Sequence, residues 1–227
     1  MNKVPVMTID GPSGSGKGTV SRAAARALGW SLLDSGALYR LVALAGRQAR
    51  VSLDDGSRLA QLAQTSDIRF GSGDSGEEVV WLGGRDVTGA IRTEQAGNDA
   101  SRVAALPRVR AALLERQRRF AVAPGLVADG RDMGTVVFPQ AEVKIFLTAS
   151  ASERASRRYK QLKEKGVAAN LAALSLEIAE RDLRDTNRAI SPLVASADAI
   201  VLDTTGMPVD AVVERVLAAA RDLAGGR

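Results

Sequence analysis

The segment GPSGSGKGT, residues 11–19, restricts the fold of this chain more than any other feature. It follows a short apolar stretch at Val4–Ile9 and leads into the alanine-rich stretch Lys17–Leu28, which Gly29 ends. The pattern predicts a buried strand, a glycine loop and a helix. Glycines tolerate positive φ angles, so successive backbone N–H groups can converge on one anion at the start of the helix. This context is typical of a phosphate-binding loop, and a plain glycine turn between strand and helix is the alternative.

The residues that end this loop indicate how it would meet a phosphate chain. Gly16 stands five positions after Gly11, and Lys17 follows it directly. In a phosphate-binding loop, the lysine at this position reaches the β- and γ-phosphates. The general motif then has Ser or Thr as a magnesium ligand, whereas this chain has Gly18 and a hydroxyl one position later, at Thr19. This displacement argues against direct magnesium ligation by the loop.

The rest of the chain alternates between predicted strands and helices. Further strands are predicted at Ser31–Leu33, Leu126–Ala128, Val143–Leu147 and Ala199–Leu202. Helices are predicted at Ala37–Gln48, Arg58–Gln64, Glu94–Ala105, Arg108–Phe120, Glu153–Lys165, Leu176–Thr186 and Val209–Leu223, with Ser150 and Pro107 as start signals and Gly166 as a stop signal. The order favours an α/β fold whose central parallel five-stranded sheet is covered on both faces. Residues 67–88 break the pattern with glycine turns and predict a small antiparallel insertion.

Composition excludes several chemistries. The 227 residues include no Cys and no His, so no disulfide, thiolate zinc site, Ser/His/Asp triad or imidazole base is available. Catalysis must then use carboxylates, Lys, Arg, hydroxyls and backbone amides, with a hard ion such as Mg²⁺ as any metal. The net charge of +5 suits either a nucleic-acid binder or an enzyme for anionic small molecules, but four Phe, two Trp and two Tyr are few for base stacking. No apolar run has the length of a membrane span, and Asp10 interrupts the first apolar stretch before it could form a signal-peptide core, so we expect a cytoplasmic protein.

The segment LVADGRD, residues 126–132, places charged residues at the end of a predicted strand. Open parallel sheets bind ligands at the carboxyl ends of their strands. Asp129 is therefore the candidate to help hold a metal ion, and Arg131 and Asp132 lie directly beyond it. An aspartate that only caps a turn is the alternative for Asp129.

Two predicted helices carry grouped arginines. Arg154, Arg157 and Arg158 follow one another at helical spacing, and Arg181, Asp185 and Arg188 share one helical face. Phosphoryl transfer depends mainly on positioning the reactants and neutralising oxygen charge, which arginines supply. Spacing alone favours solvated helix surfaces with intrahelical ion pairs, whereas the phosphate-binding loop favours a functional reading.

Together these motifs resemble those of bacterial cytidylate kinases, in the nucleoside monophosphate kinase family. The resemblance runs from about Ile9 to Asp203 and rests on GPSGSGKGT, LLDSGALYR (32–40), IRT (91–93), Ser101 with PRVR (107–110), ADGRDMGTVVFP (128–139) and RDLRDTNR (181–188). It implies a single three-layer P-loop kinase domain with residues 1–35, 103–150 and 166–227 as core, 36–102 as monophosphate-binding region and 151–165 as a short helical lid. It implies transfer of the γ-phosphoryl of MgATP to CMP or dCMP by a monomer that acts on small molecules, without nucleic-acid or membrane partners.

The resemblance also implies roles for individual residues. The donor would be held by Arg157 and by the loop residues Gly11, Pro12, Ser13, Gly14, Ser15, Gly16, Lys17, Gly18 and Thr19. The acceptor would meet Ser35, Tyr39, Arg40, Ser101, Arg110, Arg131, Asp132, Arg181, Asp185 and Arg188. Charge at the transition state would be neutralised by Lys17, Arg131, Arg158, Arg181 and Arg188, and Asp129 would help hold Mg²⁺.

Plainer readings and rival functions remain open at this point. Ser101 and Arg110 can cap and solvate helices, Tyr39 and Arg40 can be ordinary helix positions, and residues 151–165 can be a static surface helix. A P-loop kinase for UMP, AMP or a small metabolite is the nearer rival function. A basic nucleic-acid-binding NTPase is the more distant one.

Overall fold

The computed structural model describes residues 4–72, 78–164 and 166–225. The chain divides into two compact units, of which the first comprises Met1–Asp34 and Arg118–Arg227 and the second Ser35–Gln117. None of the helices among the described residues is both long enough and apolar enough to span a membrane.

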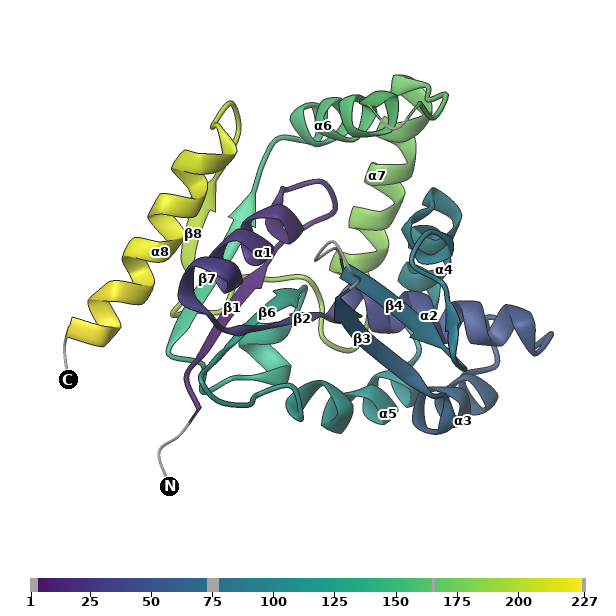
Figure 1. The fold of residues 1–227 in the computed structure, drawn as a ribbon. Helices are drawn as coiled ribbons and strands as arrows, with labels where there is room; N and C mark the ends of the chain where they lie inside the picture. The colour runs from purple at the N-terminus through teal and green to yellow at the C-terminus, as the bar shows by residue number, and fades with distance from the viewer. Residues whose placement is uncertain (1–3, 73–77, 165, 226–227) are drawn as a thin grey trace. The chain divides into compact units, whose positions relative to one another are not determined.

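The first unit is built on a parallel five-stranded sheet (Figure 1). Its strands run in the order β2 (Ser31–Asp34), β6 (Leu126–Gly130), β1 (Val6–Asp10), β7 (Val143–Thr148) and β8 (Ile200–Asp203). Every neighbouring pair is parallel, and β1 in the centre is buried over its whole length. The carboxyl ends of β1 and β6 therefore lie side by side, with Asp10 opposite Gly130.

Two helices cover one face of this sheet. α1 (Lys17–Leu28) and α8 (Val209–Gly225) pack Val20, Val212 and Val216 onto Met7 and Ile9 of β1 and their neighbours. These side chains alternate along each strand with residues of the opposite face, as the pleat requires. The apolar core beneath α1 fixes the end of β1 and the start of α1, and so it fixes both ends of the loop between them.

Backbone bonds to one carboxylate organise the opposite face beside β1. Asp10 accepts the N–H of Met133 at 2.9 Å and that of Gly134 at 2.8 Å, within the π-helical turn Met133–Val137 that follows β6. Packing there is close, because a Cβ on Gly134 would come within 2.9 Å of the Thr8 hydroxyl. The unit is completed by α6 (Ala151–Glu164) and α7 (Leu171–Asn187), which pack against each other.

The second unit contains helices and a small antiparallel sheet. Its helices are α2 (Ser35–Gln48), α3 (Gly56–Thr65), the 3₁₀ turn Ala90–Arg92, α4 (Glu94–Val103) and α5 (Pro107–Arg118), whose last residue belongs to the first unit. The sheet runs in the order β3 (Ile68–Ser72), β4 (Glu78–Leu82) and β5 (Arg85–Asp86). Ala37, Leu41, Val80 and Ile91 lie in one apolar cluster that joins α2 to this sheet.

The predicted fold class is confirmed: a central parallel five-stranded sheet with flanking helices and a small antiparallel sheet. The insertion predicted at 67–88 forms β3 to β5, and its residues 73–77 lie outside the described residues. Ser150, Pro107 and Gly166 act as expected, since Ser150 Oγ accepts the N–H of Glu153 at 3.2 Å, α5 begins at Pro107 and Gly166 has a φ of +70°.

Several predicted boundaries were wrong. α7 begins at Leu171 rather than Leu176, because Asn170 caps it by accepting the N–H of Ala173 at 3.1 Å. α2 begins at Ser35, directly after β2, rather than at Ala37. The turn Met133–Val137 was not predicted. Lys165, the last residue of the predicted lid, lies outside the described residues.

Residues 103–117 lie in the second unit, and their assignment to the kinase core stays a prediction. Side-chain contacts account for their place in the second unit. Gln117 accepts the hydroxyl of Ser35 at 2.7 Å, and Arg116 donates to the carbonyls of Ala63 and Ser66 at 3.1 and 3.2 Å. α5 is thereby tied to the start of α2 and the end of α3.

Candidate active site

The phosphate loop, residues 11–19, joins the end of β1 to the first turn of α1. Gly11, Gly14 and Gly16 have φ angles of +153°, +77° and +91°, which side chains rarely allow. A Cβ on Gly11 would lie 2.1 Å from the carbonyl oxygen of Leu147, at the end of β7. The backbone path of the loop thus requires glycine for conformation at three places, and at Gly11 and Gly14 also for space. Thr19 lies in the first turn of α1 and is exposed.

Lys17 folds back over the loop, where its Nζ donates to the carbonyl of Pro12 at 3.1 Å. Its ammonium group is enclosed by protein, although the residue as a whole keeps some exposure. Burial, and after it the nearby guanidinium of Arg131, lowers the pKa of Lys17. Asp129 and Asp34 act in the opposite direction. An anionic ligand beside Lys17 would stabilise the charged ammonium group, which burial disfavours and the nearby carboxylates only partly balance.

Asp129 lies close to this lysine at the end of β6. It is buried, and its Oδ1 has no hydrogen-bond partner among the described residues. Burial raises the pKa of Asp129, while Lys17 opposes that rise. A Cβ on Gly18 would lie 3.2 Å from Asp129 Oδ2, so a Ser or Thr side chain at this position would crowd the carboxylate. This contact gives a physical reason for the departure from the general motif at Gly18.

These residues fit a magnesium ion that is held mainly by phosphates. No group of three acidic side chains that could hold a metal occurs among the residues the structure describes. Mg²⁺ in phosphate-transfer sites usually takes one or two carboxylates, substrate phosphates and several waters. One carboxylate with an unpartnered buried oxygen, Asp129, is compatible with such an ion.

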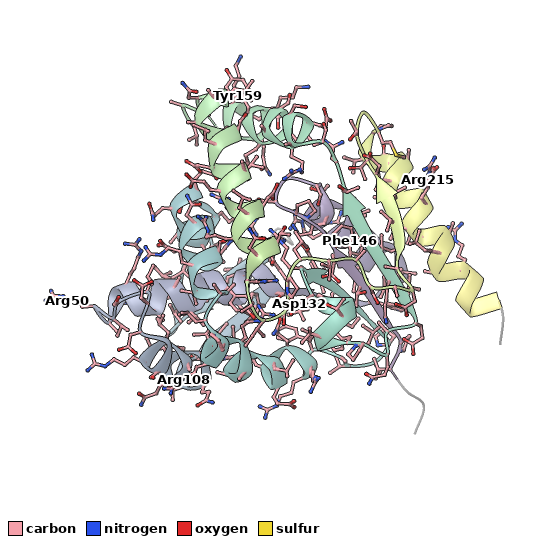
Figure 2. All side chains as sticks on the ribbon, turned by 180° about the vertical axis from the view of Figure 1, so that it is seen from behind. Arg50, Arg108, Asp132, Phe146, Tyr159 and Arg215 are labelled. Carbon is pink, nitrogen blue, oxygen red and sulfur yellow. The ribbon has the colours of Figure 1, made fainter. Side chains whose placement is uncertain are left out.

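The segment after β6 meets α7 through an ion pair. Arg131 Nε donates to Asp185 Oδ2 at 3.0 Å, and the Asp185 side chain is nearly inaccessible. Arg181, one turn earlier on α7, is buried and lies 3.4 Å from Glu177 Oε2. Arg188, at the end of α7, donates to the carbonyl of Ser191 at 2.6 Å. Asp132, labelled in Figure 2, is 3% exposed, so any group that meets this carboxylate is itself shielded from water.

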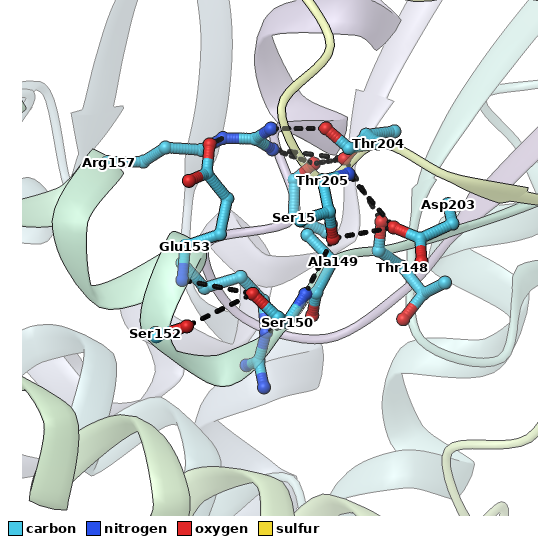
Figure 3. A network of polar contacts seen from close by, with 11 residues as sticks. Ser15, Thr148, Ala149, Ser150, Ser152, Glu153, Arg157, Asp203, Thr204 and Thr205 are labelled. Atoms are coloured by element: carbon cyan, nitrogen blue, oxygen red, sulfur yellow. Dashed lines mark hydrogen bonds and ion pairs between the residues drawn. The ribbon is translucent and has the colours of Figure 1, made fainter.

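The arginines of α6 lie against the phosphate loop. Arg154 donates to the carbonyl of Ser13 at 3.0 Å, and Arg157 donates to the carbonyl of Ser15 at 3.3 Å. Figure 3 shows Arg157 beside Ser15 and Thr204, with the carboxylate of Glu153 next to its guanidinium. Arg158 differs, because it points to Gln161 of its own helix.

In the second unit, two of the five candidate residues contact each other, and two others each contact a residue that was not a candidate. The guanidinium of Arg110 lies over the ring of Tyr39, 5.7 Å from its centre, and Arg110 also donates to the carbonyl of Ala104 at 3.2 Å. Ser35 donates to Gln117, and Arg40 donates to the carbonyl of Ile91 at 3.2 Å. Ser101 is half-buried on α4.

Four residues of these arrangements were not singled out as site residues in the sequence: Asp10, Gln117, Arg154 and Thr204. Arg154 carries a signal, since it lies one helical turn before Arg157 and Arg158. Asp10 directly precedes the loop. No local pattern marks Gln117 or Thr204, whose partners Ser35 and Ser15 are 82 and 189 residues away in the chain.

Comparison with known proteins agrees with this geometry. The family model for cytidylate kinase matches residues 7–222. A cytidylate kinase of Stutzerimonas stutzeri (strain A1501) is 60% identical over 225 residues, 98% of each chain, and one of Marinomonas sp. (strain MWYL1) is 58% identical over 218 residues, 96% of each chain. A crystal structure of an uncharacterized protein from Eubacterium ventriosum ATCC 27560 is similar in fold, with a TM-score of 0.52 at 9% identity over 95% of this chain and 97% of that one. On the strength of the family model and of these relatives, the chain belongs to the cytidylate kinase family.

Proposed function

We propose that this chain transfers the γ-phosphoryl group of ATP to CMP and dCMP, giving ADP with CDP or dCDP. The observation that carries the proposal is the phosphate loop with Lys17 folded over it, in a chain that belongs to the cytidylate kinase family. Its curated relatives carry the name cytidylate kinase over nearly their whole length. A kinase for a different acceptor and a nucleic-acid-stimulated NTPase are not favoured.

The donor polyphosphate would lie on the loop, where backbone N–H groups and the N-terminus of α1 favour an anion. Lys17 would turn from the Pro12 carbonyl to the β- and γ-phosphates. Asp129 would help hold Mg²⁺, which neutralises charge on the β- and γ-phosphate oxygens when it is bound. Arg158, which donates to Gln161 of its own helix, would approach the transferring group.

The acceptor needs no protein base. Its phosphate oxygen is already anionic near neutral pH and attacks in line, so a chain without histidine can carry out the reaction. Repulsion between the two anions is the main obstacle, and Lys17, Arg131, Arg181 and Arg188 would reduce it. Asp185 would keep Arg131 oriented through the 3.0 Å contact between Nε and Oδ2.

Roles in the recognition of CMP are proposed for individual residues. Ser35, Arg40 and Arg131 would meet its phosphate, and Arg181 with Asp185 its sugar. Ser101, Arg110 and Asp132 would read cytosine. A buried carboxylate at Asp132 pairs with the exocyclic amine of cytosine and repels the carbonyl of uracil, which gives selectivity for CMP over UMP.

The test is a panel of acceptors with ATP, measured by coupled ADP release. We expect CMP and dCMP to stimulate ADP release far above UMP, AMP and GMP, and polynucleotides to have no effect. Preferential use of another acceptor would replace the proposed substrate, and stimulation by polynucleotide would favour the rival NTPase.

Asp132→Asn tests the selectivity argument. The amide can rotate to present an oxygen or an NH₂ group, so we expect the ratio of kcat/KM for CMP over UMP to fall by at least about tenfold. An unchanged ratio in a folded, active variant would remove Asp132 from base recognition.

A further inference from the structure

Two carbonyl groups of the phosphate loop are held from outside by arginines of α6. Arg154 Nη1 donates to Ser13 O at 3.0 Å and Arg157 Nη1 donates to Ser15 O at 3.3 Å. Each of these carbonyls precedes a glycine of positive φ, Gly14 at +77° and Gly16 at +91°. The two contacts therefore act at the peptide bonds that lead into two of the three positive-φ glycines of the loop.

Holding these carbonyls also sets the direction of the neighbouring N–H groups. A trans peptide unit is planar, and its C=O and N–H point in opposite directions. A Ser15 carbonyl that faces Arg157 turns the N–H of Gly16 to the other side, away from α6, and Arg154 does the same for the N–H of Gly14. Loops with alternating backbone hand bind anions through N–H groups gathered in this way.

Thr204, directly after β8, joins the contact at Ser15 (Figure 3). The residue is 1% exposed, and its hydroxyl lies 3.3 Å from Ser15 O and 3.0 Å from Thr148 O. The same hydroxyl accepts from Arg157 Nη1 at 3.0 Å, and Arg157 Nη2 donates to the Thr204 carbonyl. Because Arg157 Nε also donates to Glu153 at 2.9 Å, three of its nitrogens are engaged by protein groups.

Arg154 is fixed just as firmly. Its Nε donates to the carbonyl of Ala149 at 3.0 Å, and its Nη2 lies 2.6 Å from Asp182 of α7. Its side chain is 7% exposed, and a Cβ on Gly14 would come within 2.9 Å of Arg154 Cβ. The arginine is therefore wedged between the loop and α7, where it cannot swing toward a ligand without breaking a buried ion pair.

We propose that Arg154, Arg157 and Thr204 are positioning residues that set the polyphosphate-binding conformation of the loop before a nucleotide arrives. The role given to Arg157 differs from the direct contact with ATP that the family resemblance implies. The inference rests on the proposed function only in taking a polyphosphate as the ligand of the loop.

The experiment compares the binding of ATP and of inorganic tripolyphosphate, both with Mg²⁺, by calorimetry. Thr204→Val keeps the side-chain shape and removes the hydroxyl, and we expect it to raise the Kd of both ligands by the same factor, about five- to tenfold. Thr204→Ser restores the hydroxyl and should bring both values within about twofold of the wild type. Thr65→Val, which removes an exposed hydroxyl that donates to the carbonyl of Gln61 on α3, is the matched control and should leave both Kd values unchanged.

A double-mutant cycle then separates positioning from direct contact. If Arg157 acts through Ser15 and Thr204, Arg157→Gln combined with Thr204→Val weakens tripolyphosphate little more than either change alone. Arg157→Lys should bind tripolyphosphate as weakly as Arg157→Gln. Lysine keeps the charge, but its single ammonium group cannot hold Ser15 O, Thr204 Oγ1 and Thr204 O together as the guanidinium does. Additive losses, or full affinity with lysine, would mean that Arg157 contacts the ligand and would overturn the proposal.

The remaining outcomes are also decisive. A loss confined to ATP, with tripolyphosphate unaffected, would mean that Thr204 serves the nucleoside and would overturn the proposal. If Thr204→Val does not fold, the comparison of Arg157→Lys with Arg157→Gln carries the test with tripolyphosphate, because Arg157 is partly exposed. Wild-type protein that binds neither ligand would refute the proposed function itself, whereas an active kinase with unaffected variants would refute only this inference.

Discussion

Two charged side chains beside the loop, Lys17 and Asp129, lie where burial disfavours their ionised forms. The pKa of Lys17 is lowered and that of Asp129 is raised, in both cases mainly by burial. Such opposed shifts in neighbouring groups are frequent at functional sites. They mean that the ligand-free protein maintains charges that a polyphosphate and a metal ion would stabilise.

Lys17→Met tests the ammonium directly. We expect turnover to fall by at least about a hundredfold, the scale of losing one electrostatic contact at the transition state. The fold should persist, because the change removes a buried charge and keeps an unbranched side chain. Steady-state kinetics with circular dichroism measures both, and near-normal turnover in the folded variant would contradict the role of the loop.

Asp10→Asn tests the buried carboxylate that holds the turn after β6. Burial raises the pKa of Asp10 from 3.8 to about 7, against the two backbone N–H groups that lower it. Between these values the folded state binds more protons than the unfolded chain, so the contribution of Asp10 to stability is complete below pH 3.8 and declines as pH rises toward 7.

The wild type should therefore lose stability relative to Asp10→Asn from pH 4 to pH 7. The free energy of unfolding of the wild type minus that of the variant should fall by at most about 1.4 kcal/mol per pH unit. Urea titrations at several pH values measure it. A difference that stays constant or grows over this interval would show that Asp10 is ionised throughout.

At the level of elements, α6 consists of two differently held halves. Its first turns are capped by Ser150 and fixed to the loop by Arg154 and Arg157. Its last turns, with Lys160, Gln161 and Lys163, are exposed. A lid that closes over the donor would then move beyond Arg157, while the start of the helix stays with the loop.

Hydrogen exchange measures this division. In the ligand-free protein we expect amides of residues 155–157 to exchange at least about tenfold more slowly than those of 160–164. ATP should slow the second group more than the first. Equal exchange along the helix would argue against a fixed first half.

How far sequence predicts these elements depends on how local their causes are. The strand, loop and helix around Lys17 follow from adjacent residues, and so do the start of α5 at Pro107 and the turn at Gly166. The turn Met133–Val137 could not be foreseen, because it depends on Asp10, 123 residues away in the chain. No local pattern marks Thr204 either. It reaches the loop because the sheet order places β8 beside β7.

For the molecule as a whole, the net charge of +5 left an enzyme for small anions and a nucleic-acid binder both open. Ligand-linked stability separates them. ATP with Mg²⁺ at a hundred times its Kd should stabilise the protein by about 2.7 kcal/mol and raise its Tm, and CMP should do so independently. Thermal denaturation with each ligand measures this, and a rise in Tm with polynucleotide but not with CMP would favour the rival function.

The braced loop also bears on biosynthesis. Residues that set its peptide planes lie at positions 154, 157 and 204, so a growing chain carries residues 11–19 long before it carries what shapes them. A nascent polypeptide would have to release Thr204 from the ribosome before it could capture a nucleotide, long after residues 11–19 have emerged. For the same reason, an excised peptide of residues 1–35 would not hold residues 11–19 in the anion-binding conformation, although it contains every residue of the motif.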